Sequence, residues 1–102
     1  MTIGVGRSVR IAGDPQAALA FAKEMSAHIG KWPGVKRSVV WQNMGGPTGT
    51  LIFFSECEDL ASLDRINTYM AEDKTYWGKI ADARQKGLFD LSSAQDMILR
   101  QL

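Results

Sequence analysis

Apolar and polar residues alternate along the first segment of the chain with the period of two that is typical of a β-strand. One face of residues 3–11 is apolar and carries Ile3, Val5, Val9 and Ile11. The other face is small or polar and carries Gly4, Gly6, Ser8 and Arg10. The pattern therefore predicts a strand over residues 3–11 with two unlike faces.

A helical pattern follows this strand. Asp14 can cap a helix whose first position is Pro15, where the missing N–H costs nothing. Apolar residues then recur at gaps of three and four, which predicts one buried stripe: Ala18, Phe21, Ala22, Met25, Ile29 and Trp32. Pro33 and Gly34 end the helix.

Two further strands are predicted around a turn. Residues 35–44 alternate again, with Val35, Val39 and Trp41 on one face, so we expect a half-exposed strand. Residues 45–49, "GGPTG", are typical of a turn. The segment "TLIFFSE", residues 50–56, is apolar on both faces, which predicts a central strand covered on both sides.

A second helix is predicted after residue 58, capped by Asp59 or Ser62. Its stripe at helical spacing is Leu63, Ile66, Met70, Trp77, Ile80 and Arg84. Asp73 can cap the N–H groups near Tyr76, so we expect this helix to kink or restart at Asp73 and to turn Trp77 toward the sheet or a partner subunit. "KGLFD" ends the helix, and residues 94–102 are expected to form the closing strand.

The order strand, helix, strand, strand, helix, strand predicts an α+β fold of the ferredoxin-like βαββαβ type, with a four-stranded antiparallel sheet and two helices on one face. The 102 residues correspond to a single domain, residues 1–102. Such a sheet leaves its second face without cover. Because the Ile3–Val5–Val9–Ile11 face is too apolar for water, we expect a partner to bury one sheet face, and a second copy of the chain is the simplest partner.

The element order, the strand "LIFFSE" and a second helix that begins "EDLASLDRI" and carries "DKTYW" resemble the dimeric α+β barrel superfamily. That superfamily includes antibiotic-biosynthesis-monooxygenase-like, NIPSNAP-like and EthD-like domains. The resemblance covers nearly the whole chain. It implies a homodimer in which two sheets close a barrel with the helices outside, and a pocket between the sheet and the helices of each chain. Haem-degrading members resemble this chain in fold but carry an Asn on the first strand and a His after a Trp on the second helix; neither is present here.

Candidate ligand-binding residues follow from residue type and expected face. Gly4, Gly6 and Ser8 leave a trough that either accepts a closely packed helix or forms the floor of a ligand pocket roofed by the helices. The full candidate set is Gly4, Gly6, Ser8, His28, Trp41, Asn43, Asn67, Tyr69 and Trp77. His28 has no Ser, Cys or carboxylate at a spacing that forms a triad, so it is expected to be a satisfied histidine at the border of the core, and no catalytic residue is assigned.

Arg7 interrupts the apolar face of the first strand. A guanidinium there needs a carboxylate partner, because an unpaired buried charge is strongly destabilising. We expect an ion pair across strands or subunits, with Glu56 or Asp96; the alternative is that Arg7 recognises an anionic ligand.

Composition excludes several classes of function. Twelve basic and 11 acidic residues give a net charge of +1, and the densest basic cluster, Lys31, Lys36 and Arg37, is too small for a nucleic-acid-binding face. "GVGRSV" has Val9 where a dinucleotide loop needs its third glycine, and "GGPTGT" lacks the lysine of a phosphate loop. The single cysteine, Cys57, makes neither an internal disulfide nor a zinc site, so no metal and no cofactor are expected. No signal-peptide pattern or apolar run of membrane-spanning length is present, and we expect a cytoplasmic protein without membrane contact.

Two functions fit these observations, and the sequence does not decide whether the protein is an enzyme. The first is a homodimeric protein that binds a small apolar or aromatic molecule between its sheet and helices. The alternative, which the resemblance implies, is a cofactor-independent monooxygenase or isomerase acting on an aromatic or polyketide-like substrate.

Overall fold

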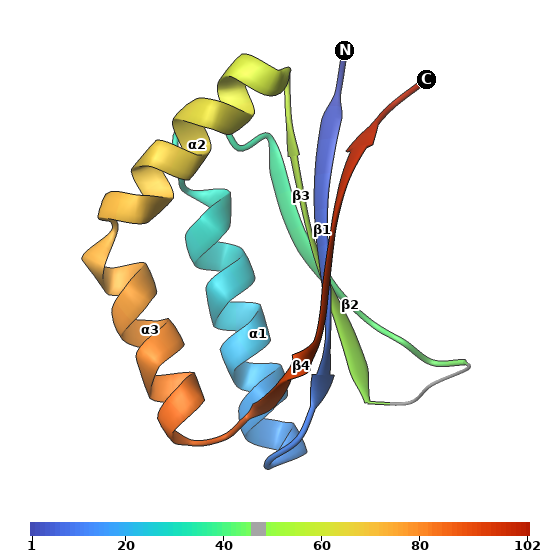
Figure 1. Ribbon diagram of the computed structural model, residues 1–102, viewed down its shortest axis with the longest axis vertical. Helices are drawn as coiled ribbons and strands as arrows, with labels where there is room; N and C mark the ends of the chain where they lie inside the picture. Colours follow the sequence, from blue (N-terminus) through green and yellow to red (C-terminus); the bar gives the residue numbers. More distant parts are fainter. Residues whose placement is uncertain (46–48) are drawn as a thin grey trace.

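The computed structural model describes residues 1–45 and 49–102. Within them the elements follow in the order β1 (Ile3–Ile11), α1 (Pro15–Gly30), β2 (Arg37–Gln42), β3 (Thr50–Cys57), α2 (Leu60–Glu72), α3 (Lys74–Gln85) and β4 (Phe89–Arg100). The strands form an antiparallel sheet in the order β2-β3-β1-β4. All three helices lie on one side of this sheet (Figure 1). The ferredoxin-like α+β prediction is confirmed, whereas most of the turn expected over 45–49 lies outside the described residues.

Aspartate caps set the helix boundaries as the sequence predicts. The Asp14 carboxylate accepts a hydrogen bond from the Gln16 N–H at 3.1 Å, and Pro15 takes the first helical position. At the second helix, the cap is Asp59, whose carboxylate accepts from the Ser62 N–H at 2.8 Å. Ser62 is therefore inside α2 and does not cap it.

Asp73 divides the expected second helix into two. Its backbone is extended, α2 ends at Glu72, and α3 begins at Lys74. The Asp73 carboxylate accepts from the Tyr76 N–H at 3.1 Å, which is the cap geometry that the sequence predicts. The predicted restart is confirmed, so the sheet carries three helices where an uninterrupted reading gives two.

The last strand begins earlier than the sequence indicates. β4 pairs with β1 from Ile11↔Phe89 onward, and its register shifts between Ser8 and Arg10. At this irregularity the Ser93 hydroxyl accepts a hydrogen bond from the Arg10 N–H at 2.9 Å. The bulge interrupts the period of two, and this is why alternation alone recovers only the part of β4 after residue 94.

The hydrophobic core lies between the helices and the sheet. Its main cluster of buried residues is Ile3, Met25, Trp32, Cys57, Ile66 and Tyr76. The apolar face of β1 therefore meets the helices of its own chain. This face receives its cover from the chain's own helices, which bury Ile3 and Val9, so the sheet face left for a partner is the opposite one.

The opposite sheet face has no helix over it, and we call it the open face. Strand register places Gly4, Gly6 and Ser8 on it, together with side chains from the other strands: Val39, Trp41, Ile52, Phe54, Met97 and Leu99. A Cβ built on Gly4 would lie 2.7 Å from Cζ of Phe54, so the Phe54 ring lies directly over this glycine. Both expectations for the glycine trough are corrected, because a cross-strand phenylalanine covers Gly4 on the side away from the helices.

Candidate functional site

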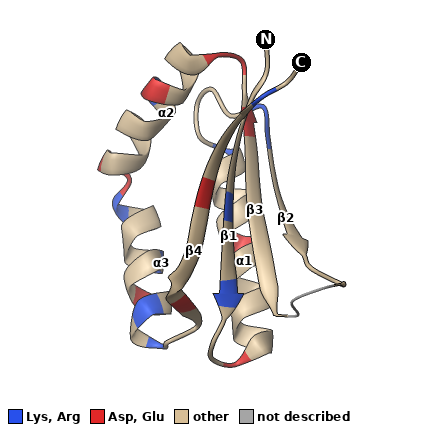
Figure 2. Cartoon of the chain, turned by 45° about the vertical axis from the view of Figure 1, so that its right-hand side comes forward, with Lys and Arg blue, Asp and Glu red and all other residues tan. Residues whose placement is uncertain are grey.

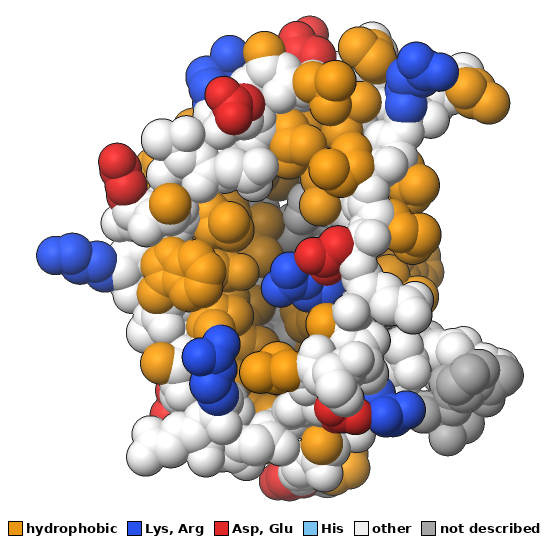
Figure 3. Space-filling model, in the orientation of Figure 1, with side chains coloured by type: hydrophobic (Ala, Val, Ile, Leu, Met, Phe, Trp, Pro, Cys, Tyr) orange, Lys and Arg blue, Asp and Glu red, His pale blue; other side chains and the backbone are white. Residues whose placement is uncertain are grey.

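A hollow opens between α3 and the β1–β4 side of the sheet. Helix α1 packs against β2 and β3, and α2 packs against β3, whereas α3 packs on α1. β4 therefore lies at the edge of the sheet that the helices cover least (Figure 1). Figure 3 shows the hollow between the helices and the strands, with hydrophobic side chains inside it and a basic and an acidic group in contact at its sheet side.

The ion pair on the helix-facing side of these strands is Arg7–Asp96. Arg7 of β1 stands directly opposite Asp96 of β4, and Figure 2 shows the basic band of β1 beside the acidic band of β4. The Arg7 Nε donates to Asp96 Oδ1 at 2.6 Å, and Nη2 donates to Oδ2 at 2.7 Å. These hydrogen bonds raise the pKa of Arg7 and lower the pKa of Asp96, so both groups are charged. The cross-strand partner predicted for Arg7 is confirmed as Asp96; Glu56 instead lies 3.5 Å from Arg37.

Both members of this pair are more than half exposed, which corrects the expectation of a buried guanidinium. An exposed ion pair stabilises a fold by about 1 kcal/mol at most. Stability alone therefore gives little reason for two charges to stand among the apolar side chains of this face.

Tyr76 brings a phenol to the same region from α3. Its ring is buried, with the Trp32 ring at 5.0 Å and the Trp77 ring at 5.0 Å. The Tyr76 hydroxyl makes no hydrogen bond in the described part of the chain. Since no side-chain polar atom in that part is both fully buried and without a partner, this hydroxyl is accessible from open space. Burial raises the pKa of Tyr76; the Arg7 charge acts to lower it and the Asp96 charge to raise it. The hydroxyl is therefore a neutral phenol within electrostatic reach of the ion pair.

Hydrophobic side chains also lie in the hollow (Figure 3). Phe53 stands opposite Arg7 on the helix-facing side of the sheet and, like Met70 of α2 and Ile80 of α3, is partly buried against the main core. Ile98 pairs with Val5 on the helix-facing side of the sheet and is nevertheless 64% exposed, because no helix covers this part of β4. The region combines an aliphatic and aromatic surface with one small group of polar atoms, which is the usual composition of a small-molecule site. Among residues 1–45 and 49–102, no three His, Cys, Asp or Glu side chains gather as a metal site would require.

His28 belongs to a different cluster, at the α2–α3 junction. Its Nε2 lies 2.7 Å from Asp73 Oδ2, and the Trp32 Nε1 donates to the same oxygen at 2.7 Å. The hydrogen bond with His28 is the largest cause that lowers the pKa of Asp73, to about 2. The expectation of a satisfied border histidine is confirmed. The carboxylate stands 45 residues away in the chain, beyond any local spacing rule.

The nine predicted ligand-binding residues do not gather in one place. Gly4, Gly6, Ser8 and Trp41 lie on the open face. His28 lies at the α2–α3 junction, Tyr69 packs its ring 6.1 Å from that of Trp32, Asn67 is exposed on α2, and Asn43 follows β2. Trp77 lies on α3, next to Tyr76.

Of the two orientations predicted for Trp77, toward the sheet or toward a partner subunit, the structure contradicts the first. Its Nε1 donates to the Met70 carbonyl at 2.9 Å, and its side chain is about half exposed. The indole therefore folds back onto the end of α2 and does not point into the sheet. Sequence reasoning passed over Tyr76, whose place three residues after the capping Asp73 was the available signal.

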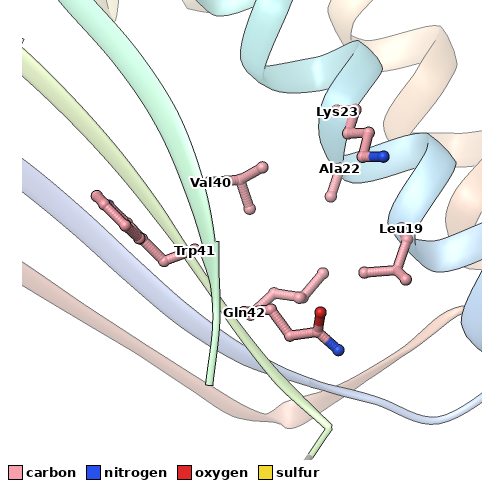
Figure 4. Close-up of a pocket in the computed structure, with 7 residues that line it drawn as sticks. Leu19, Ala22, Lys23, Val40, Trp41 and Gln42 are labelled. Atoms are coloured by element: carbon pink, nitrogen blue, oxygen red, sulfur yellow. The ribbon is translucent and has the colours of Figure 1, made fainter. Parts of the chain in front are cut away.

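A groove of about 240 Å³ lies on the other side of α1, along β2. Figure 4 shows Val40 and Leu19 pointing toward each other across it, while Trp41 points to the far side of the strand. The polar side chains at this groove, Lys23 and Gln42, are exposed. An open depression of about 410 Å³ marks the α2–α3 junction, lined by Tyr69, Glu72, Asp73, Lys74 and Thr75. Neither brings together apolar side chains, the Arg7–Asp96 ion pair and the Tyr76 hydroxyl, so we take the hollow beside α3 as the candidate site.

No family model and no curated protein sequence matches this chain. Several solved structures, by contrast, match it over nearly its whole length. SnoaB, a cofactor-independent oxygenase from Streptomyces nogalater, is 10% identical with a TM-score of 0.73, covering 98% of this chain and 92% of its own. A NIPSNAP family protein from Agrobacterium tumefaciens is 20% identical with a TM-score of 0.74, covering 100% and 94%. A candidate antibiotic biosynthesis monooxygenase from Deinococcus radiodurans is 12% identical with a TM-score of 0.71, covering 100% and 93%. At these identities the likeness shows the fold. In the described residues, no helix has both the length and the apolar character needed to span a membrane.

Proposed function

Because the chain has the fold of the antibiotic-biosynthesis-monooxygenase-like and NIPSNAP-like domains, we propose that it forms a homodimer through its open face and binds a small apolar or aromatic molecule in the hollow of each chain. The observation that carries the proposal is the hollow itself, an apolar surface with a free phenol hydroxyl and a fixed ion pair at one place. The two sheet faces thus have separate roles.

The open face has the composition of a protein interface. Trp41 is 57% exposed, Met97 51% and Leu99 45% in the isolated chain. Ion pairs stand at the two ends of this face: Arg37–Glu56 at one end and Arg10–Asp90 at the other. An apolar, aromatic centre with a charged rim is the anatomy of a specific interface.

The size of the chain's surface supports the same conclusion. Its accessible surface is 6711 Å², whereas a compact monomer of 11.2 kDa exposes roughly 5,700 Å². The difference, roughly 1,000 Å², compares with about 800 Å² that each partner buries in a standard interface. A second copy on the open face would remove an area of this order and leave the hollow accessible.

The test uses two neighbouring residues of β4 that point to opposite faces. Met97 lies on the open face, and Ile98 lies on the helix-facing side, so each is the matched control for the other. In sedimentation velocity, wild type and Ile98→Lys should be dimers, and Met97→Lys a folded monomer. In a titration of the neutral dye N-phenyl-1-naphthylamine, wild type and Met97→Lys should show saturable fluorescence enhancement, and Ile98→Lys should lose it. A monomeric wild type, or dye binding that Ile98→Lys leaves unchanged, would contradict the corresponding half of the proposal.

One observation favours a second candidate function, a cofactor-independent monooxygenase or isomerase: SnoaB, which shares the fold, is described as a cofactor-independent oxygenase. In such a reaction a quinol supplies its own electrons to O₂, so that one oxygen atom enters the ring and the other leaves as water. A general base works best with a pKa near the operating pH. In the hollow the pKa of Asp96 is lowered by Arg7 and that of Tyr76 is raised by burial, so neither group is suited to this task. This electrostatic arrangement favours binding over catalysis.

Oxygen uptake in the presence of a hydroanthraquinone separates the two functions. An enzyme should consume O₂ in proportion to its concentration, and Tyr76→Phe or Trp77→Phe should change the rate. Uptake at the rate of buffer alone, with no effect of these variants or of His28→Ala, would remove the monooxygenase, which is the O₂-consuming form of the second function.

A further inference from the structure

We propose that the molecule bound in the hollow carries a carboxylate, held by the free edge of Arg7 and by the Tyr76 hydroxyl. The inference rests on the proposed binding function and names the chemical class of its ligand. It starts from the two polar elements that the core of the chain does not use.

The guanidinium of Arg7 has donors to spare. Arginine carries five N–H groups in a planar fork, and Asp96 engages only Nε and one hydrogen of Nη2. In the described residues no other acceptor contacts Arg7, so both hydrogens of Nη1 and the second hydrogen of Nη2 are free. Those two nitrogens form a second edge, and such an edge matches the two oxygens of a planar carboxylate.

Asp96 acts as a positioning residue in this arrangement. Its two oxygens hold Nε and Nη2 at 2.6 and 2.7 Å, which fixes the plane of the guanidinium on the sheet. Since a long arginine side chain otherwise loses rotamer freedom on binding, a guanidinium that is already fixed binds its ligand at a smaller entropic cost. The pair therefore presents an oriented guanidinium. Asp96 occupies its Nε–Nη2 edge, and the Nη1–Nη2 edge is left for a ligand.

Tyr76 supplies the matching donor from across the hollow. Its ring is fixed against Trp32 and Trp77, and its hydroxyl has no partner among the described residues. The phenol is neutral, so it has a proton to donate to an anionic oxygen. An apolar ligand body against Phe53 and Ile98 on the helix-facing side of the sheet, with its carboxylate toward Arg7 and Tyr76, would engage the free donors of both residues.

The test compares two probes that differ only in charge at one group. 2-Naphthoate and 2-naphthamide have the same ring and nearly the same shape, and each is titrated by displacement of N-phenyl-1-naphthylamine. Wild type should bind naphthoate at least about 10-fold more tightly than naphthamide, which corresponds to about 1.4 kcal/mol. Arg7→Gln should bring this ratio close to one, Tyr76→Phe should reduce it, and Arg37→Gln, on the open face, should leave it unchanged.

The outcomes separate this inference from the proposed function. If the dye binds and both naphthyl probes displace it equally, or if Arg7→Gln preserves a preference for naphthoate, the carboxylate assignment is overturned while the binding function stands. If neither the dye nor either probe binds the folded dimer, the binding function itself fails. Thermal unfolding of Arg7→Gln checks that the variant is folded, which we expect because the Arg7–Asp96 pair is exposed.

Discussion

The substitution Gly4→Ala tests how the open face is built. A Cβ at Gly4 would lie 2.7 Å from Cζ and 2.8 Å from Cε2 of Phe54, whereas ordinary contacts of this kind begin near 3.4 Å. The phenyl ring must therefore retreat by about 0.7 Å or change rotamer. Gly6 is the matched control, because a Cβ there meets no atom closer than 3.8 Å.

The size of the effect depends on whether a second copy covers Phe54. In an isolated chain the ring is free to swing over the open face, so the cost to folding is small. In a dimer closed over this face, overpacking costs roughly 1–3 kcal/mol at each ring. The clash occurs once in each chain, so the dissociation constant of the dimer should rise by about 30-fold or more.

Sedimentation velocity over a concentration series measures this constant directly. We expect Gly4→Ala to shift the monomer–dimer midpoint to higher concentration, and Gly6→Ala to leave it within a few fold of wild type. Thermal unfolding at low protein concentration should show little difference between the two variants. Equal dissociation constants for Gly4→Ala and Gly6→Ala would refute the placement of Phe54 in the interface.

Two further predictions concern the helices and their junctions. Gly78 lies in α3 with open space where a Cβ would be, so Gly78→Ala should stabilise the fold by about 0.5–1 kcal/mol and raise the melting temperature by a few degrees. Gly13→Ala should lower the melting temperature, because its Cβ would lie 2.7 Å from the carbonyl oxygen of Gly87, and the backbone there has little freedom to move away. The pKa of Asp73 is about 2 in the folded chain, against an ordinary value of 3.8. The stability that the ionised Asp73 carboxylate contributes is therefore fully present above pH 3.8 and is lost as the pH falls toward 2. In urea unfolding, the gap between wild type and Asp73→Asn should narrow from pH 5 to pH 2, and a gap that stays constant would show that the Asp73 charge does not stabilise the fold.

The elements of the fold were predictable because each follows from local chemistry. Alternation marks β1, and carboxylates at Asp14 and Asp73 mark helix starts that the structure confirms. Which face of β1 meets the helices was not predictable in this way. Alternation shows that the strand has two faces, but which face meets the helices depends on the other strands, here on Phe54, which covers Gly4 from across the sheet.

The candidate site was predictable only in part, for a related reason. Arg7 drew attention because a charge interrupts an apolar face, and its partner Asp96 was one of two carboxylates expected. The signal at Tyr76 was only its place three residues after the capping Asp73, because its hydroxyl comes within electrostatic reach of the ion pair only once α3 is turned at Asp73. Trp41 and the glycines were chosen by type and expected face, and the register places them on the other side of the sheet.

The claim that the two faces of the sheet have separate roles is tested most directly by amide chemical-shift mapping of the wild-type dimer. Isotope-labelled protein is titrated with N-phenyl-1-naphthylamine, and the shifts that saturate with the dye are assigned to residues. We expect these shifts to gather around Arg7, Tyr76 and Ile98, on the helix-facing side, and the signals of Trp41 and Leu99 to stay unchanged. Saturable shifts on Trp41 and Leu99, with none at Tyr76, would contradict it.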